Sequence, residues 1–190
     1  MSEIIIAPFS HNALRDWPAG QFKALTELLL RQISLHMSIA VVGTRSQRIA
    51  AAEIVRPFPV RRVSNACGLP WETVLHKLRG AACVIGNNSG ITHVSSYFGV
   101  PTVCVFGGSH QRTEWGALGP TTVILSRVIG CSPCQLNHIR DCPYNAACLH
   151  EIEPGEVASA ALRVMGRSDQ HENAADRQKT GSLEKTVAQC

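Results

Sequence analysis

The 190-residue sequence is 45% hydrophobic and 17% charged, which is typical of a globular protein with a buried core. No apolar stretch approaches the roughly 18 residues that a membrane-spanning helix needs, and the N-terminus has no signal-peptide pattern, so we expect a cytoplasmic protein without a transmembrane segment. The formal net charge of +4 suits a phosphorylated ligand or an anionic membrane surface, whereas the scattered basic residues and few aromatic ones disfavour nucleic acid as a partner.

Apolar runs alternate with amphipathic segments in the first half of the chain. In chain order we predict a strand at 4–7, a helix at 18–35, a strand at 39–42, a helix from a Ser46 cap to residue 55, a short strand at 60–63, a helix at 71–81, a strand at 83–85, a helix at 91–98 and a strand at 102–106. Pro18 suits the first turn of the first helix, and Phe22, Leu25, Leu28 and Leu29 share one of its faces. This alternation predicts an α/β fold: a Rossmann-like, doubly wound parallel sheet covered on both faces.

The second half of the chain is less regular. The periodic pattern breaks down after Gly107 and returns in a single helix at about 154–165. From residue 166 onward the sequence is polar with few large apolar residues, which indicates a disordered tail. We therefore predict one domain at residues 1–165 and a polar tail at 166–190.

Two turns of small residues follow neighbouring predicted strands. Asn87-Asn88-Ser89-Gly90 leads directly into a helix, and Gly107-Gly108-Ser109 follows the next strand. Ligands of open α/β sheets bind beyond the carboxyl ends of the strands, where backbone N–H groups and helix N-termini bind anions. Two such turns side by side suit a diphosphate. For the first turn alone, a simple helix cap at Asn88 or Ser89 explains the residues equally well, and a lone His93 is more often structural than catalytic.

Taken in order and spacing, these motifs resemble a known family. The segment from Cys83 to Pro120 resembles the C-terminal half of the ADP-heptose:lipopolysaccharide heptosyltransferases, glycosyltransferase family nine. The family's Asp-Thr-Gly-x-x-His turn is matched by Asn88–His93, its Gly-x-Pro by Gly99–Pro101, and its Phe-Gly-Pro-Thr by Phe106–Ser109, with Trp115 soon after. Its opening turn and Lys-x-Trp-Pro pattern are matched by Pro8-Phe9-Ser10 and Arg15-Asp16-Trp17-Pro18, so that the resemblance runs from about residue 4 to 165.

The resemblance implies the donor-binding, C-terminal half of a GT-B fold, in which two Rossmann-like domains face a cleft. By position, the residues expected to bind the donor's phosphates and sugar are Ser10, Arg15, Asn88, Ser89, Gly90, His93, Gly107, Gly108 and Ser109. Residues 65–69 are expected near the base and ribose, and Trp17 is expected to pack on the following helix. For Arg15 the alternative is a solvated surface charge. Two departures concern the donor sugar: Asn88 replaces the family's usual Asp and removes a charge, and Arg15 replaces Lys.

The implied activity is transfer of a sugar from an ADP- or UDP-sugar to lipopolysaccharide or a related glycan, by an inverting mechanism that requires no cofactor, at the inner face of the inner membrane. The family's acceptor-binding N-terminal domain has no counterpart in these residues. We therefore expect half of an enzyme that is inactive alone, with a separately encoded N-terminal half as a candidate partner. Only His93 is a candidate catalytic residue within the chain.

Four of the eight cysteines fall close together, at Cys131, Cys134, Cys142 and Cys148. Four thiols at short spacing predict a structural zinc site, although the usual second Cys-x-x-Cys pair is missing; reversible disulfides and simple reduced thiols are the alternatives. Cys67, Cys83 and Cys104 lie in apolar contexts and are expected to be packing residues. A catalytic pair of Cys134 with His138 is disfavoured because no orienting group is near in sequence.

Two other functional classes fit the same sequence. One is a non-catalytic module that binds a nucleotide or nucleotide-sugar, and the other is a small metal-binding interaction protein in which the cysteines are the functional part. A nicotinamide dehydrogenase is disfavoured because no Gly-x-Gly-x-x-Gly follows the first strand.

Overall fold

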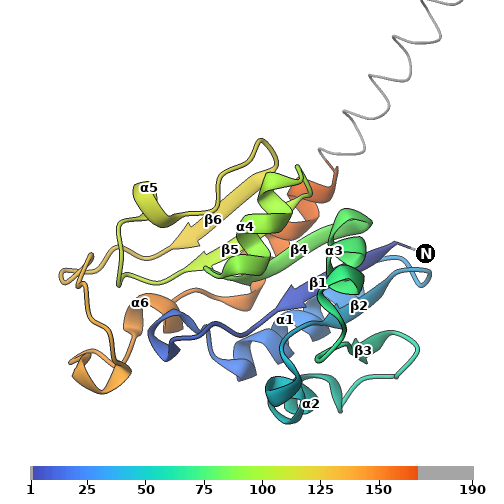
Figure 1. Cartoon of the computed structure of the whole chain (residues 1–190), viewed down its shortest axis with the longest axis horizontal. Helices are drawn as coiled ribbons and strands as arrows, with labels where there is room; N and C mark the ends of the chain where they lie inside the picture. The colour runs from blue at the N-terminus through green and yellow to red at the C-terminus, as the bar shows by residue number, and fades with distance from the viewer. Residues whose placement is uncertain (1, 167–190) are drawn as a thin grey trace, which may run out of the picture.

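The computed structural model describes residues 2–166, which form one six-stranded parallel sheet in the order β3-β2-β1-β4-β5-β6 (Figure 1). The strands are β1 (Glu3–Ala7), β2 (Ser38–Val41), β3 (Val63–Asn65), β4 (Ala81–Asn87), β5 (Thr102–Phe106) and β6 (Thr122–Ser126). The strand order reverses between β1 and β4, which pair directly. Loops that leave the two strands there diverge, and ligands of such folds bind at this point. The predicted Rossmann-like fold class is confirmed.

The helices lie on both faces of the sheet. They are α1 (Ala19–Gln32), α2 (Arg48–Val55), α3 (Trp71–Arg79), α4 (Gly90–Tyr97), α5 (Arg112–Trp115), α6 (Ala147–His150) and a last helix at 154–166, with short 3₁₀ turns at Ala13–Arg15, Arg45–Gln47 and Ile139–Asp141. In Figure 1, α3 and α4 cover the face toward the viewer, and α1 and α2 cover the far face. Among residues 2–166, no helix has the length and apolar character to cross a membrane.

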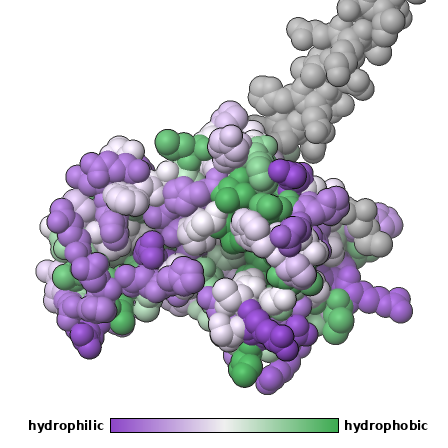
Figure 2. Space-filling view, in the orientation of Figure 1, coloured by the Kyte–Doolittle hydropathy of each residue, from purple (hydrophilic) through white to green (hydrophobic). Residues whose placement is uncertain are grey.

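Alternate side chains of the strands divide between two cores. Ile4 and Ile6 pack on the far face with α1 and the last helix, whereas Ile5 and Ala7 pack on the near face with α3 and α4. Successive side chains of a strand point to opposite faces of the sheet. Because both faces are buried, these strands have apolar residues at consecutive positions. Figure 2, seen from the same side, shows apolar surface over α4 with polar side chains around it.

Three details differ from the sequence predictions. The strand β6 was not predicted, although it pairs with β5 over five positions; it is a half-buried edge strand preceded by a helix of a single turn. The third strand is Val63–Asn65 rather than 60–63, because residues 59–62 form a turn in which Arg62 N–H donates to Pro59 O. Ser46 does not cap a helix: it lies within a 3₁₀ turn that begins after Thr44, whose N–H donates to Gln47 Oε1 at 2.8 Å. The predicted tail lies almost wholly outside the described residues.

Candidate functional site

A pocket of about 330 Å³ opens at the carboxyl edge of the sheet, beside the point where the strand order reverses. Its wall combines the loops that leave β1, β2 and β4 with the start of α3. The lining residues are Ala7, Phe9, Ser10, His11, Val42, Gly43, Thr44, Gln47, Leu69, Trp71, Val74, Ser89, Gly90 and Ile91. The lining therefore combines apolar side chains with small polar groups. A cavity of this size and lining suits a small organic ligand with a polar end.

The loop after β1 is fixed by an internal hydrogen-bond network. Ser10 N–H donates to Asp16 Oδ1 at 2.7 Å, and Ser10 Oγ donates to Asn12 O at 2.8 Å. Asn87, at the end of β4, donates from Nδ2 to Pro8 O at 2.7 Å and to Asp16 Oδ1 at 3.2 Å. The two loops that flank the pocket are thus joined to each other before any ligand binds, which lowers the cost of ordering them.

Trp17 anchors the same loop in the core. Its ring is fully buried and meets Phe22 edge-on at 4.9 Å, while Nε1 donates to Ile152 O at 3.0 Å. Its backbone N–H donates to Asn87 Oδ1 at 3.0 Å. The predicted packing role of Trp17 on the following helix is therefore confirmed.

The turn after β4 places the predicted residues around the start of α4. Asn88 is 5% exposed, and its N–H donates to Val105 O, so the turn is held between β4 and β5. Ser89 is the N-cap residue of α4, and its N–H donates to Thr92 Oγ1 at 3.2 Å. Gly90 is exposed, lines the pocket, and has no atom within 4 Å of the position that a Cβ would take. The helix cap and the turn that lines the pocket are thus the same structure.

Two buried polar atoms of the described residues make no hydrogen bond of normal geometry: Arg15 Nε, and Ser89 Oγ, which faces the backbone N–H of Thr92 in the capping box of α4. Both belong to the residues predicted to bind phosphate. Leaving a buried donor unsatisfied costs about 1–3 kcal/mol, more for a charged group, so native proteins rarely do so without a partner outside the chain. Arg15 lies in the 3₁₀ turn after β1 and Ser89 in the turn after β4. Ser89 lines the pocket, whereas Arg15 is not among its lining residues. The chain therefore presents unused hydrogen-bonding capacity from the two loops on either side of the strand-order reversal.

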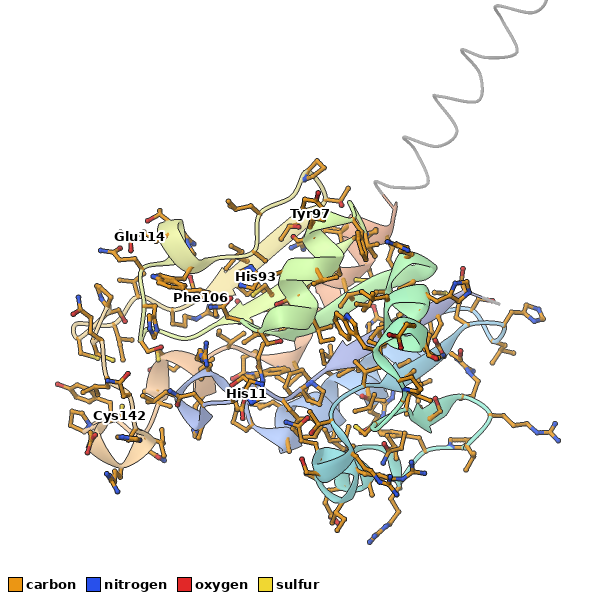
Figure 3. The ribbon with its side chains drawn as sticks, in the orientation of Figure 1. His11, His93, Tyr97, Phe106, Glu114 and Cys142 are labelled. Atoms are coloured by element: carbon orange, nitrogen blue, oxygen red, sulfur yellow. The ribbon has the colours of Figure 1, made fainter. Side chains whose placement is uncertain are left out.

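His93 stands one turn into α4 and is exposed (Figure 3). Its Nε2 lies 2.9 Å from Asn88 Oδ1. Partial desolvation lowers the pKa of His93 below its usual value. A neutral imidazole therefore stands beside the β4 turn, although it does not line the pocket itself.

The second predicted anion turn, Gly107–Ser109, is not brought into the pocket. All three residues are buried, and Gly107 and Gly108 line a separate hollow of about 210 Å³ beyond β5 and β6. Gly108 N–H donates to Cys148 Sγ at 3.2 Å, and the carbonyls of Gly108 and Ser109 accept from Cys134 and Gln135. The turn is occupied by contacts with the cysteine-rich segment, which folds back over it.

The four clustered cysteines share one neighbourhood beyond the carboxyl ends of the strands, and Figure 3 labels one of them, Cys142. Burial raises the pKa of the Cys148 thiol, with smaller contributions from Cys142, Cys131 and Cys134. Within residues 2–166, however, no three His, Cys, Asp or Glu side chains are arranged to hold a metal ion. Zinc at this cluster therefore stays a prediction.

The other three cysteines among residues 2–166 are buried, as the sequence predicted. Cys67, Cys83 and Cys104 are buried, and burial raises the pKa of the Cys67 thiol to about 11 and that of Cys104 to about 12. These thiols are protonated packing residues at neutral pH.

Part of the pocket was missed by sequence reasoning. Of the residues predicted near a base and ribose, Leu69 lines the pocket, whereas Asn65 instead donates to Arg48 O at 2.9 Å. The loop after β2 was not predicted, although Gly43 and Thr44 line the pocket. Their position directly after an apolar strand is the signal that could have identified them.

Comparisons with known proteins identify the family and the fold. Residues 2–144 match the model of glycosyltransferase family 9 (heptosyltransferase). No significant match was found among curated protein sequences.

Several solved structures have the same fold. ADP-heptose LPS heptosyltransferase II from E. coli has a TM-score of 0.73 at 15% identity, covering 88% of this chain and 47% of that one. E. coli heptosyltransferase WaaC with ADP gives 0.59 at 20% identity, covering 72% and 41%. The iron-containing dodecameric glycosyltransferase TibC from enterotoxigenic E. coli gives 0.62 at 19% identity, covering 88% and 45%. The chain spans less than half the length of each. By the family match over most of its described residues, the chain belongs to glycosyltransferase family 9, the heptosyltransferase family.

Proposed function

We propose that this chain binds a nucleotide-sugar donor, an ADP- or UDP-sugar, and serves as the donor side of a transferase that glycosylates lipopolysaccharide or a related glycan. The observation that carries the proposal is the pair of unsatisfied buried atoms, Arg15 Nε and Ser89 Oγ, on the two loops at the strand-order reversal. A diphosphate has enough acceptor oxygens to satisfy both at once. A guanidinium also binds phosphate through two parallel hydrogen bonds, which a neutral ligand would not use.

The pocket accounts for the rest of such a ligand. Its apolar lining residues, Val42, Leu69, Trp71 and Ile91, suit the flat face of a nucleobase. Its polar lining includes Ser10, in the loop after β1, and Ser89 and Gly90, at the start of α4. The helix N-terminus adds positive potential where the diphosphate would lie.

In such a reaction, this chain would stabilise the leaving group. Sugar transfer releases a nucleoside diphosphate, whose negative charge grows in the transition state. Arg15 and the α4 N-terminus would stabilise that charge. Activation of the acceptor hydroxyl needs a general base and an acceptor-binding surface, which we propose are supplied by a second, N-terminal-type domain facing this edge.

Isothermal titration with ADP, UDP and an ADP-sugar tests the proposal. Arg15→Gln removes the guanidinium and should weaken nucleotide binding about 10-fold to 100-fold, because a hydrogen bond to a charged group is worth roughly 1.5–3 kcal/mol. The matched control is Arg31→Gln, whose side chain is exposed on α1 and pairs with Glu27. No heat with any nucleotide at millimolar concentration, or equal loss in both variants, would defeat the proposal.

A non-catalytic nucleotide-binding module would give the same titration. A transfer assay with radiolabelled donor and a co-expressed N-terminal-type partner separates the two functions, because only the transferase yields a labelled glycan.

A further inference from the structure

Asn88 and His93 form a fixed pair across the first turn of α4. Asn88 is 5% exposed and is held from both sides: it follows β4, and its N–H donates to Val105 O at the end of β5. His93 N–H donates to Ser89 O, which fixes its place on the helix. The contact between the two side chains is 2.9 Å, from Asn88 Oδ1 to His93 Nε2.

The chemistry of this contact determines where the imidazole proton lies. An amide oxygen only accepts hydrogen bonds, so His93 Nε2 must carry the hydrogen. In a neutral imidazole the other nitrogen, Nδ1, then holds a lone pair. Within residues 2–166, Nδ1 has no hydrogen-bond partner. We propose that Asn88 is a positioning residue that keeps His93 as the neutral Nε2–H tautomer and so presents Nδ1 as a hydrogen-bond acceptor to the ligand.

A carboxylate at position 88 would produce the opposite result. It would stabilise the imidazolium, in which both nitrogens donate and neither accepts. The amide gives no such stabilisation, and partial desolvation already lowers the pKa of His93. No charged group contributes to that shift. His93 is therefore uncharged at neutral pH, and it is not a cationic partner for phosphate.

An acceptor nitrogen one turn into α4 is suited to a hydroxyl group. A phosphate oxygen has no hydrogen to donate, whereas each sugar hydroxyl has one. The inference rests on the proposed function and deepens it: His93 Nδ1 selects a donor whose sugar carries a hydroxyl within reach of the diphosphate site. Arg15 and Ser89 hold the diphosphate, and Asn88 and His93 recognise the sugar.

The first test needs no ligand. Two-dimensional ¹H–¹⁵N NMR of the ligand-free chain reports the protonated ring nitrogen of each histidine, and exposed His36 and His76 in the same spectrum serve as references. We expect His93 at pH 7.5 in the Nε2–H form. The Nδ1–H form, which would mean that the Asn88 amide is turned to donate from Nδ2, overturns the proposal.

Asn88→Asp makes the test directional. The carboxylate should raise the pKa of His93 by about 1–3 and leave the references unchanged. An unchanged His93 pKa in a folded variant overturns the proposal. If the variant fails to fold, as judged by circular dichroism, the tautomer measurement on the unmodified chain decides alone.

The second test separates this inference from the proposed function. His93→Ala should weaken binding of the ADP-sugar about two- to tenfold, the value of one neutral hydrogen bond, and leave ADP binding unchanged. Equal affinities of the variant and the unmodified chain for the ADP-sugar overturn the role of His93, while ADP binding upholds the nucleotide site. Failure of the unmodified chain to bind either ligand would instead defeat the proposed function.

Discussion

Replacing Gly90 with Val should abolish nucleotide binding without weakening the fold. Gly90 is the first residue of α4 and lines the pocket, and a Cβ at this position meets no protein atom within 4 Å. The added side chain therefore projects into the space that the diphosphate would occupy rather than into the protein. Because Val is a better helix former than Gly by a few tenths of a kcal/mol, we expect unchanged or slightly raised thermal stability.

The size of the binding loss follows from the contacts that are blocked. A diphosphate held away from the α4 N-terminus loses at least one hydrogen bond between a charged group and a backbone N–H, worth about 1.5–3 kcal/mol. Losing the approach to Ser89 Oγ as well adds about 1 kcal/mol. The dissociation constant should therefore rise at least 50-fold, and Gly90→Ala should give a smaller increase.

Isothermal titration with ADP measures the affinity, and thermal unfolding followed by circular dichroism measures the stability. The control is Gly20→Ala, on the first turn of α1, where a Cβ also meets nothing within 4 Å but no pocket is near. Unchanged ADP affinity in Gly90→Val would refute the placement of the diphosphate at this turn. A large loss of stability would refute the statement that the position is open.

Three further predictions concern the fold, the cysteines and the activity. Gly86→Ala should lower the free energy of unfolding by about 1–3 kcal/mol, because the added Cβ would lie 2.6 Å from Ala7 O where β1 and β4 pair. The control Gly20→Ala should leave the stability unchanged. Equal melting temperatures of the two variants would contradict the close approach at Gly86. Protein purified under reducing conditions should contain about one zinc per chain if Cys131, Cys134, Cys142 and Cys148 bind metal, measured by elemental analysis for zinc and iron; no metal and four freely titratable thiols would establish reduced cysteines. The 190 residues alone should bind donor but transfer no sugar, since loss of a general base costs about 10²–10⁴-fold and loss of acceptor positioning roughly 7–11 kcal/mol; robust turnover that is lost on His93→Ala would make this chain a self-sufficient transferase.

Most of the sheet and the Asn88–Gly90 turn could be predicted from the sequence because local residues determine them. Continuous apolar runs predicted β1, β2, β4 and β5, since a parallel strand buried on both faces needs apolar side chains at every position. The short strand β3, Val63–Asn65, has no such run and was predicted three residues too early. The sixth, β6, lies half-buried at an edge, and the helix before it has only one turn. The strand–helix alternation that guided the prediction is absent there.

The site was predictable where it depends on one loop and unpredictable where distant segments meet. The Asn88–Gly90 turn follows a strand and starts a helix, and both features are visible in the sequence. The Gly107–Ser109 turn has the same local features, but Cys148 lies 40 residues later and accepts from Gly108 N–H. No local pattern reveals that contact. The sequence predicted two adjacent anion-binding turns. In the structure, the Asn88–Gly90 turn is open to the pocket, whereas the Gly107–Ser109 turn is packed against the cysteine-rich segment.

The placement of the donor can be seen directly in a crystal structure of the chain with a bound ADP-sugar. We expect a diphosphate that accepts hydrogen bonds from Arg15 Nε and Ser89 Oγ, with the base against Leu69 in the pocket beyond β1, β2 and β4. A nucleotide bound instead in the hollow beyond β5 and β6, with Arg15 Nε and Ser89 Oγ still unpartnered, would contradict this placement.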